Sequence, residues 1–589
     1  MKQGQSRHNK KRDDRKMKKI ISFRTKIEAI AIAGLFIMIT IGSVFAVTRT
    51  ITSTGDSFDT FIRNSKGNYW TATRANLQTA IYDLANVSGT VWIPSGTIVF
   101  TNMINLTSNI TIRGTGMNST VLRLSNSYSG YQGFWLRGHL VHNVTLCDFS
   151  MDGNNRTGTI VNNAVAIQID NSSYFHFYNI HIYNLYRAGI ILNENHNAYS
   201  DLTNLFINDV DDYPTTQQML KIRNSQYITG ENFHFKGNGI NRSTFLTWGM
   251  DLNGVNWSRF SDVEISGTGG GMKFESSATN ICHNLTFDGI TIRNLTNNGL
   301  VAGYQMQGIW CRYIKDSNFF NLNIEYGWGG IYTASTSYRL NFNNIIMHKN
   351  PKACAINGYS FALCSDFTNI NNMQCYNGTA VALSHSGLYI NGGDDCKITN
   401  VELKGFKKGI YISSSVRDTF VNVASENNNE YGVTLETASN MTFIGCRFKS
   451  NTIDGVDDFG SAVKNIIFSG CTVNANVKGF DLSATCTNIS IDNCHIKYNT
   501  NDGIEIDSAN FVNIIGNQIW GNGGEQIDDN IGATATNIKI MGNVGDATCN
   551  AFCLPTAAPT VPHSGSMYVN VTTGDIAVYS GTAWIWTHG

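Results

Sequence analysis

A repeat of 23–25 residues in the C-terminal half restricts the folds open to this chain more than any other feature. Gly409, Gly432, Gly455, Gly479 and Gly503 each open a short segment of alternating apolar residues, such as "GIYIS" or "GFDLS". Between them, "FIGCRF", "FSGCTV", "IDNCHI" and "IIGNQI" recur in the same phase. Alternation of this kind, bounded by turns rich in Asn, Ser and Gly, predicts short β-strands.

One such coil cannot bury its apolar face, whereas stacked coils bury a continuous core, with strands about 4.8 Å apart along the stack. We therefore predict an all-β chain whose residues 57–545 form a right-handed parallel β-helix solenoid. The handedness follows the general rule for parallel crossovers. About 15 or more coils would give a rod roughly 70 Å long. Cys446, Cys471 and Cys494 recur at matching positions, where we expect them to act as small apolar core side chains.

The N-terminus has the pattern of a targeting segment. Residues 1–28 form a basic tail, and an uncharged, largely apolar run follows over residues 29–47. This run just reaches the length needed to span a bilayer, and the basic flank would keep the N-terminus on the cytoplasmic side. A cleaved signal peptide ending at Ala46 is the open alternative. In either case we expect an exported protein, anchored at the cell surface or secreted, and its Asn-X-Ser/Thr sites suggest a glycoprotein.

The C-terminal end is a separate small unit in the sequence. Residues 546–562 hold three of the six prolines and predict a linker. Residues 563–589 contain two alternating segments around "TTGD", which predicts a β-hairpin module that is too small to be stable alone. Whether Cys549 and Cys553 form a local disulfide is left open.

Composition narrows the class of partner. Charged residues make up 15% of the chain, and the formal net charge is zero, so we expect no nucleic-acid partner. The chain also has no phosphate-binding loop, no dinucleotide-binding glycine pattern and no zinc-binding cysteine spacing.

The segment from Thr73 to Leu124, beginning "TRANLQTAIYDLANVSGTVWIPSGT", resembles the opening of pectate-lyase-like β-helix proteins. In that superfamily a short helix caps the N-terminal end of the core, and a "G-x-V-x-x-P-x-G" strand and turn follow. The resemblance implies a helical cap over Ala75–Asn86 and a first coil over Gly89–Thr97. It implies no single activity, because lyases, hydrolases, epimerases, tailspikes and adhesins share the fold.

The string "NGGDDC" contains adjacent aspartates, Asp394 and Asp395, that resemble the catalytic pair of polygalacturonases. In that family the pair precedes the exposed strand, whereas here the strand "GLYI" comes first, and the "GHG" and "RIK" motifs are missing. The coil register aligns the pair with Arg417 and Asp418. We therefore predict a polar turn at this point and no catalytic site.

A better candidate site follows from the strand register. In each "G-h-x-h-x" segment the two h positions point into the core and the two x positions point outward. Successive coils read in this way collect charged and aromatic side chains on one outer face. The outward residues are Lys221, Arg223, Asp251, Asn253, Lys273, Glu275, Trp310, Arg312, Tyr332, Tyr389 and Tyr411.

Uronan lyase chemistry suits this face if the protein is an enzyme. Cleavage needs cations to neutralise the substrate carboxylate, a role open to Arg312 and, as substrate-binding residues, to Lys221 and Arg223. It also needs a base to remove the adjacent proton, and Lys273 could serve if its neighbours lowered its pKa.

Hydrolysis would need two carboxylates instead. Asp251 and Glu275 are expected roughly 8 Å apart, a separation compatible with an inverting glycosidase. In either case Trp310 and Tyr332 would offer ring faces to sugars.

Two further alternatives stay open. Outward charges on stacked coils can pair as exposed salt bridges of small value, which would leave a non-catalytic surface or adhesin-like rod. A second outward row, Asp457, Asp481, Glu505 and Asp507, could hold Ca²⁺. The sequence thus predicts an exported β-helix protein that binds or cleaves polysaccharide, with the rod as the alternative.

Overall fold

The computed structural model divides the chain into two compact units, Met1–Ser57 and Phe58–Gly589. The first unit lies outside the described residues, and with it the basic tail, the apolar run over residues 29–47 and Ala46. Within the described part, no helix is long and apolar enough to cross a bilayer. The described residues are 60–125, 134–154, 165–185, 188–193, 197–210, 218–237, 248–275, 277–295, 307–325, 329–348, 359–377, 386–458, 460, 462–482, 486–528, 537–545, 567–569, 576–579 and 584–587.

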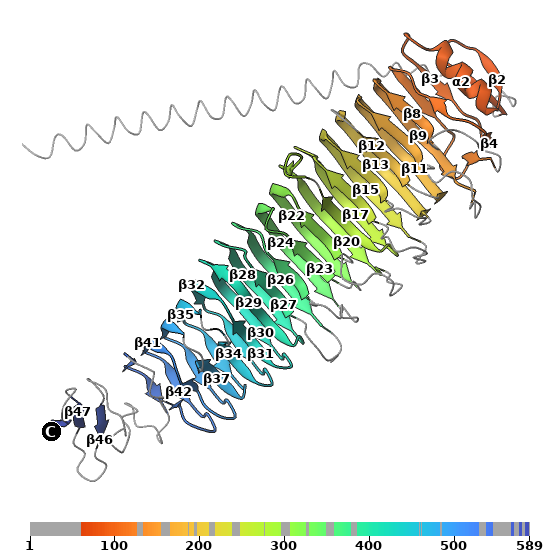
Figure 1. The fold of residues 1–589 in the computed structure, drawn as a ribbon. Helices are drawn as coiled ribbons and strands as arrows, with labels where there is room; N and C mark the ends of the chain where they lie inside the picture. The colour runs from red at the N-terminus through yellow and green to blue at the C-terminus, as the bar shows by residue number, and fades with distance from the viewer. Residues whose placement is uncertain are drawn as a thin grey trace, which may run out of the picture. The chain divides into compact units, whose positions relative to one another are not determined.

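The chain from the first coil onward winds through two parallel sheets, so the predicted all-β solenoid is confirmed (Figure 1). Sheet 1 carries the predicted outward face, and each of its strands pairs in parallel with the strand one coil away. Its strands are β5 (Ile104–Asn105), β8 (Phe134–His139), β10 (Val165–Asp170), β12 (Ala188–Asn193), β14 (Gln218–Arg223), β16 (Trp248–Asn253), β18 (Gly270–Glu275), β21 (Gln307–Arg312), β23 (Gly329–Thr333), β25 (Tyr359–Leu363), β27 (Ser386–Asn391), β29 (Lys408–Val416), β31 (Tyr431–Leu435), β34 (Asp454–Asp458), β37 (Lys478–Leu482), β40 (Ile504–Ile506) and β43 (Ile527–Asp528).

Sheet 2 stacks in the same way. Its strands are β3 (Gly89–Trp92), β6 (Ile110–Arg113), β9 (His142–Asp152), β11 (Ser173–Leu185), β13 (Asn197–Val210), β15 (Ser225–Lys236), β17 (Arg259–Ser266), β19 (Cys282–His283), β20 (Thr286–Arg293), β22 (Ile314–Glu325), β24 (Tyr338–His348), β26 (Asn369–Tyr376), β28 (Lys397–Lys404), β30 (Thr419–Glu426), β32 (Ala438–Ile444), β35 (Lys464–Ser469), β38 (Thr487–Asp492), β41 (Asn510–Ile515) and β44 (Lys539–Met541). The later coils add a short strand each: β33 (Arg447–Lys449), β36 (Thr472–Asn474), β39 (His495–Lys497), β42 (Gln518–Trp520) and β45 (Val544–Gly545).

The first described residues form β1 (Phe61–Asn64), β2 (Tyr69–Thr71), β4 (Gly96–Phe100), β7 (Thr120–Leu124) and one helix, α2 (Arg74–Asp83). The Thr73 hydroxyl accepts a hydrogen bond from the Asn76 N–H and so satisfies one of the free donors at the helix start. Leu77 and Ile81 are fully buried, and α2 lies against β1, β2 and β5. The helix overlaps the range Ala75–Asn86.

The C-terminal unit has three short antiparallel strands, β46 (Met567–Val569), β47 (Ile576–Tyr579) and β48 (Trp584–Thr587). The pairing of Val569 with Ile576 spans the "TTGD" segment, and β48 is a strand beyond the two of a hairpin. The linker residues 546–562, with Cys549 and Cys553, lie outside the described residues.

Aromatic stacks fill the core between the sheets. The rings of Phe260, Phe287, Phe319 and Phe342 lie one above another, with centroids 5.4, 5.0 and 4.7 Å apart. Cys446, Cys471 and Cys494 are buried free thiols in the matching core position, as predicted.

Buried asparagines form a second internal row, here called the asparagine ladder. It runs through Asn428, Asn451, Asn476, Asn499 and Asn522, one residue in each coil. Each side chain donates to the side-chain oxygen of the next, at 2.8–3.2 Å. The same oxygen also accepts the backbone N–H of the preceding asparagine, so both amide groups are satisfied inside the coil.

In the turn from sheet 1 to sheet 2, successive coils have a residue of positive φ at one equivalent position, here called the corner position. Asparagine tolerates this left-handed conformation better than most residues. The corner residues are Asn109, Asn143, Tyr174, Tyr227, Trp257, Asn284, Asp316, Arg339, Phe367, Asp395, Arg417, Asn440, Asn465, Asn488, Phe511 and Asn537.

Candidate functional site

The register of sheet 1 aligns five of the predicted site residues in one row. Lys221 pairs with Asp251, Asp251 with Lys273, Lys273 with Trp310, and Trp310 with Tyr332, each across one coil. We call these five residues the central row. The flanking core residues, such as Leu252 and Phe274, are fully buried, so the row lies on the outer face as expected.

The first part of the row is a half-buried ion pair. Lys221 Nζ lies 3.5 Å from Asp251 Oδ2. Burial lowers the pKa of Lys221, because it removes water from the ammonium group, while Asp251 acts in the opposite direction. Arg223 lies two residues further along β14, and its Nε has no hydrogen-bond partner among the described residues.

Lys273 is nearly enclosed. It is 7% exposed, its Nζ forms an ion pair with Glu275, and it lies 5.8 Å from the ring centroids of both Trp248 and Trp310. Arg312 Nη1 approaches the other oxygen of Glu275 at 3.6 Å. The structure therefore brings Lys273, Glu275 and Arg312 together, and it places the proposed base in an ion pair.

The aromatic part of the row is less accessible than its sequence suggests. Trp310 is 6% exposed, so its ring faces neighbouring side chains rather than solvent. Tyr332 is half-buried and begins a row of tyrosines with Tyr359, Tyr389 and Tyr411, at centroid separations of 6.2, 6.0 and 5.3 Å.

The aspartates of "NGGDDC" lie in a turn, as predicted, but one residue out of the expected alignment. Asp395 pairs with Arg417, both being corner residues, and the Asp394 carboxylate accepts the Val416 N–H at 2.8 Å. The residue opposite Asp418 is Cys396, whose N–H donates to the Asp418 carboxylate. The two turns have equal length from Ile390 to Asp395 and from Ile412 to Arg417, so the expected alignment was wrong by one residue.

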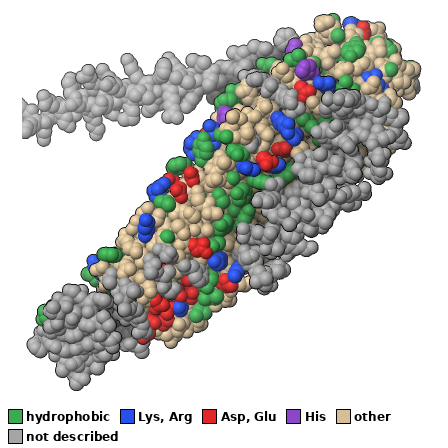
Figure 2. Space-filling model, in the orientation of Figure 1, with side chains coloured by type: hydrophobic (Ala, Val, Ile, Leu, Met, Phe, Trp, Pro, Cys, Tyr) green, Lys and Arg blue, Asp and Glu red, His purple; other side chains and the backbone are tan. Residues whose placement is uncertain are grey.

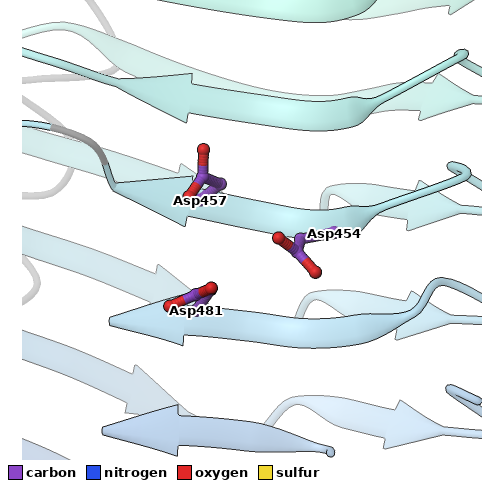
Figure 3. Close-up of side chains that lie close together, drawn as sticks. All are labelled: Asp454, Asp457 and Asp481. Atoms are coloured by element: carbon purple, nitrogen blue, oxygen red, sulfur yellow. The ribbon is translucent and has the colours of Figure 1, made fainter. Parts of the chain in front are cut away.

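Acidic side chains gather toward the C-terminal coils (Figure 2), and there the register of sheet 1 continues the central row into a group of aspartates (Figure 3). Asp454, Asp457 and Asp481 each offer an oxygen within 4.8 Å of the others, and Asp502, Glu505 and Asp528 form a second such set. Asp507 belongs to neither set. Burial raises the pKa of Asp454 to about 6 and that of Asp457 to about 8, and the neighbouring carboxylates add to both shifts.

A pocket that the sequence did not indicate lies where sheet 1 turns into sheet 2. Its volume is about 590 Å³. The lining is polar and rich in amides: Asn224, Gln226, Asn256, Asn280, His283 and Lys315, with Ser225, Gly254, Ala278, Thr279 and Ile281.

Two exposed aromatic corner residues stand beside this pocket. Tyr227 and Trp257 are 39% and 47% exposed, and their rings stack at 5.6 Å with 14° between the planes. The His283 ring, part of the pocket wall, meets the Trp257 ring edge-on at 4.6 Å. We call Tyr227 and Trp257 the aromatic pair. The signal in the sequence was a pair of aromatic residues at the corner position of two adjacent coils, where asparagine is frequent although Tyr174, Phe367 and Phe511 are also aromatic.

Residues 386–544 match the family model described as the right handed beta helix region. This region is a right-handed β-helix. No curated protein sequence matches this chain. The fold confirms the resemblance to pectate-lyase-like β-helix proteins that the opening residues indicated.

Three solved structures illustrate how far the similarity of this β-helix extends. The pre-mature gene product 12 of bacteriophage phi29 is 12% identical, with a TM-score of 0.45, over 79% of this chain and 71% of that one. The catalytic domain of a GH87 α-1,3-glucanase in complex with nigerose is 14% identical, with a TM-score of 0.33, over 83% and 70%. Full-length tailspike protein 2 from Escherichia coli O157:H7 bacteriophage CAB120 is 13% identical, with a TM-score of 0.36, over 60% and 45%. At these values the function has to be argued from this chain's own residues.

Proposed function

We propose that this β-helix binds a polysaccharide across the aromatic pair and the adjoining amide-lined pocket. The observation that carries the proposal is the exposed stack of Tyr227 on Trp257 at the wall of that pocket. Sugar rings present apolar C–H faces that pack on aromatic rings, and their hydroxyls pair with amides. The site supplies both kinds of group side by side, because the rings adjoin the lining residues Gln226, Asn256 and His283.

The backbone of the pair supports a functional role. Tyr227 has a φ of +57° and Trp257 a φ of +47°. For such side chains the left-handed conformation costs about 1–2 kcal/mol, whereas asparagine meets the same geometry at lower cost. Bulky exposed rings in strained positions favour a selected surface over a chance one.

The pocket can select among sugars. Asn224, Gln226, Asn256 and Asn280 offer both donors and acceptors, which suits hydroxyl-rich ligands. Lys315 adds a cation to the lining, which favours sugars that carry a carboxylate.

Binding is tested with the full-length protein on a panel of neutral and uronic-acid polysaccharides. The variants are Trp257→Asn and Tyr227→Asn, because asparagine keeps the corner backbone. Phe367→Asn is the matched control, since Phe367 is an isolated corner aromatic, 53% exposed. We expect retention by at least one glycan, a loss of tenfold or more in affinity in each pair variant, and no change in the control. No binding across the panel, or equal loss in all three variants, would contradict the proposal and favour a non-catalytic rod.

A second candidate function is cleavage of a uronan by β-elimination on sheet 1. It is favoured by four cations, Lys221, Arg223, Lys273 and Arg312, around only two carboxylates, Asp251 and Glu275. Lys273 would have to leave its ion pair with Glu275 to act as a base.

The measurement for cleavage is ultraviolet absorbance of unsaturated ends, recorded beside reducing ends. Unsaturated product that is lost in Lys273→Ala and Arg312→Ala would establish the lyase. Reducing ends without absorbance would instead point to Asp251 and Glu275 as hydrolytic carboxylates.

We further propose that the protein acts outside the cell, at the surface or in secreted form. The basic residues 1–28 and the apolar run 29–47 support this placement. Protease added to intact cells should digest or shed the protein, and complete protection would contradict it.

A further inference from the structure

The late coils hold a cluster of three buried carboxylates that the proposed glycan site does not use. Asp454 and Asp457 lie on β34, and Asp481 lies on the neighbouring strand β37 (Figure 3). As whole residues, the three aspartates are 3%, 2% and 8% exposed. One oxygen from each lies within 4.8 Å of the other two.

Two carboxylate oxygens of these aspartates lack a hydrogen-bond partner among the described residues. Asp457 Oδ2 and Asp481 Oδ1 are buried with no donor among the described residues. The other contacts of the cluster are few: Asp454 Oδ1 accepts the Lys478 N–H at 3.1 Å, and Asp481 Oδ2 accepts from Lys478 Nζ at 2.8 Å. A buried carboxylate oxygen without a donor loses its hydrogen bonds to water on folding and forms none in their place, which is unfavourable.

The nearby cations do not balance the cluster. Lys478 Nζ is shared with Glu505 of the next coil. Lys408 also acts on Asp457, but its Nζ lies 4.1 Å from the Tyr411 ring centroid. Three carboxylates in one enclosed space therefore share little more than one ammonium group, and like charges held this close repel.

We propose that Asp454, Asp457 and Asp481 bind a calcium ion that joins β34 to β37. Carboxylate oxygens are ligands for hard cations, and Ca²⁺ holds them at about 2.3–2.6 Å, so two ligands of one ion can lie up to about 5 Å apart. The oxygens of the cluster fall within that span. Magnesium binds at about 2.0–2.1 Å and would require a tighter set, with no two ligands more than about 4.2 Å apart.

The test uses the full-length protein after removal of metal with a chelator. Calcium chloride is titrated into it by calorimetry, and thermal unfolding is followed with and without the ion. We expect a binding heat and a higher Tm in calcium, because the ion binds only the folded cluster. Asp457→Asn should weaken binding at least tenfold and abolish the rise in Tm. Asp507→Asn, in the same acidic row but outside the cluster, should behave as the wild type.

Several results would overturn the calcium site: no heat and no change in Tm, an unchanged response in Asp457→Asn, or an equal rise in Tm in sodium chloride of matched ionic strength. Magnesium binding as tight as calcium would overturn the choice of ion. If Asp457→Asn does not fold, Asp454→Asn carries the same expectation, because its remaining oxygen can still accept the Lys478 N–H. The outcome is independent of glycan binding, which is measured on a different set of coils.

Discussion

Arg417 forms a two-pronged ion pair with Asp395 of the preceding coil: its Nε and Nη2 each lie 2.7 Å from a different oxygen of the carboxylate. Both residues occupy corner positions, and the guanidinium lowers the pKa of Asp395. The aspartate pair that resembles a catalytic dyad in the sequence is thus engaged in holding one turn to the next. A carboxylate bound in this way is a poor proton donor.

We predict that Asp395→Asn has little effect. Exposed ion pairs contribute little because water and salt screen them, so the free energy of unfolding should be nearly unchanged. Any glycan binding or cleavage should be unchanged. Thermal unfolding and the glycan panel check both points, and loss of a hydrolytic activity in this variant would restore the polygalacturonase interpretation.

Trp257→Asn should leave stability nearly unchanged. The variant loses the stacking of Trp257 on Tyr227, worth about 0.5–1.5 kcal/mol, and it relieves backbone strain of a similar size. We expect a change in the free energy of unfolding within about 1 kcal/mol, measured by denaturant or thermal unfolding. Asn284→Ala, at the next corner, is the comparison and should be destabilised, because alanine has no such tolerance of positive φ. A larger loss in Trp257→Asn would make the tryptophan a structural residue.

Asn476→Ala should be clearly destabilising. The Asn476 side chain accepts from Asn451 and donates to Asn499 and to the Phe448 carbonyl, all inside the coil. Truncation leaves several of these groups without a partner, at about 1–3 kcal/mol for each buried group. We expect the free energy of unfolding to fall by about 2–4 kcal/mol in total. The loss should appear as a lower Tm and as faster amide exchange in the neighbouring coils.

The control for the ladder is Asn474→Ala in the same coil. Asn474 Oδ1 has no partner in the described part of the chain, so its removal should cost little. Equal destabilisation by the two substitutions would mean that the ladder contributes nothing beyond ordinary packing.

The stability of the late coils should fall as pH rises from about 4 to about 7. Asp418 is fully buried, and burial raises its pKa from 3.8 to about 7, against the opposing hydrogen bonds from Ser415 and Cys396. In this interval the folded chain keeps a proton that the unfolded chain has lost, so stability is full below the unfolded pKa and is lost as pH rises through the folded pKa.

Asp418→Asn tests this dependence. The variant stays neutral at every pH, so its Tm relative to the wild type should climb between pH 4 and pH 7 and then level off. The slope contributed by one carboxyl is at most about 1.4 kcal/mol per pH unit. A constant difference across this range would rule out Asp418 as the titrating group.

The fold was predictable because the repeat determines both the strands and the way in which they stack. Alternating residues give strands, and the constant spacing from Gly409 to Gly503 puts the same residues above one another. The buried cysteines followed from the same phase. The asparagine ladder has the same spacing, but asparagine is frequent throughout the chain, and the spacing alone does not show that these side chains are buried.

The site was predictable only in part, because strand register determines which face of the sheet a side chain lies on but not how exposed that side chain is. The sequence placed Lys273 and Trp310 on the outer face, and both lie there. It did not indicate that each would be at most 7% exposed, since exposure depends on how closely neighbouring side chains such as Trp248 and Glu275 pack. Nor did it indicate that the rings of Trp257 and Tyr227 would stack, since stacking depends on the corner conformation and on a neighbour one coil away.

The asparagine ladder makes adjacent coils chemically interchangeable. Asn451 receives from Asn428 the same bonds that it gives to Asn476, so removal of one whole coil would bring Asn428 against Asn476 with every donor and acceptor still matched. Duplication of a coil would likewise leave every donor and acceptor of the ladder matched. The length of the rod can therefore drift by whole coils during evolution at small energetic cost, and the reach of the protein can be tuned separately from its binding chemistry.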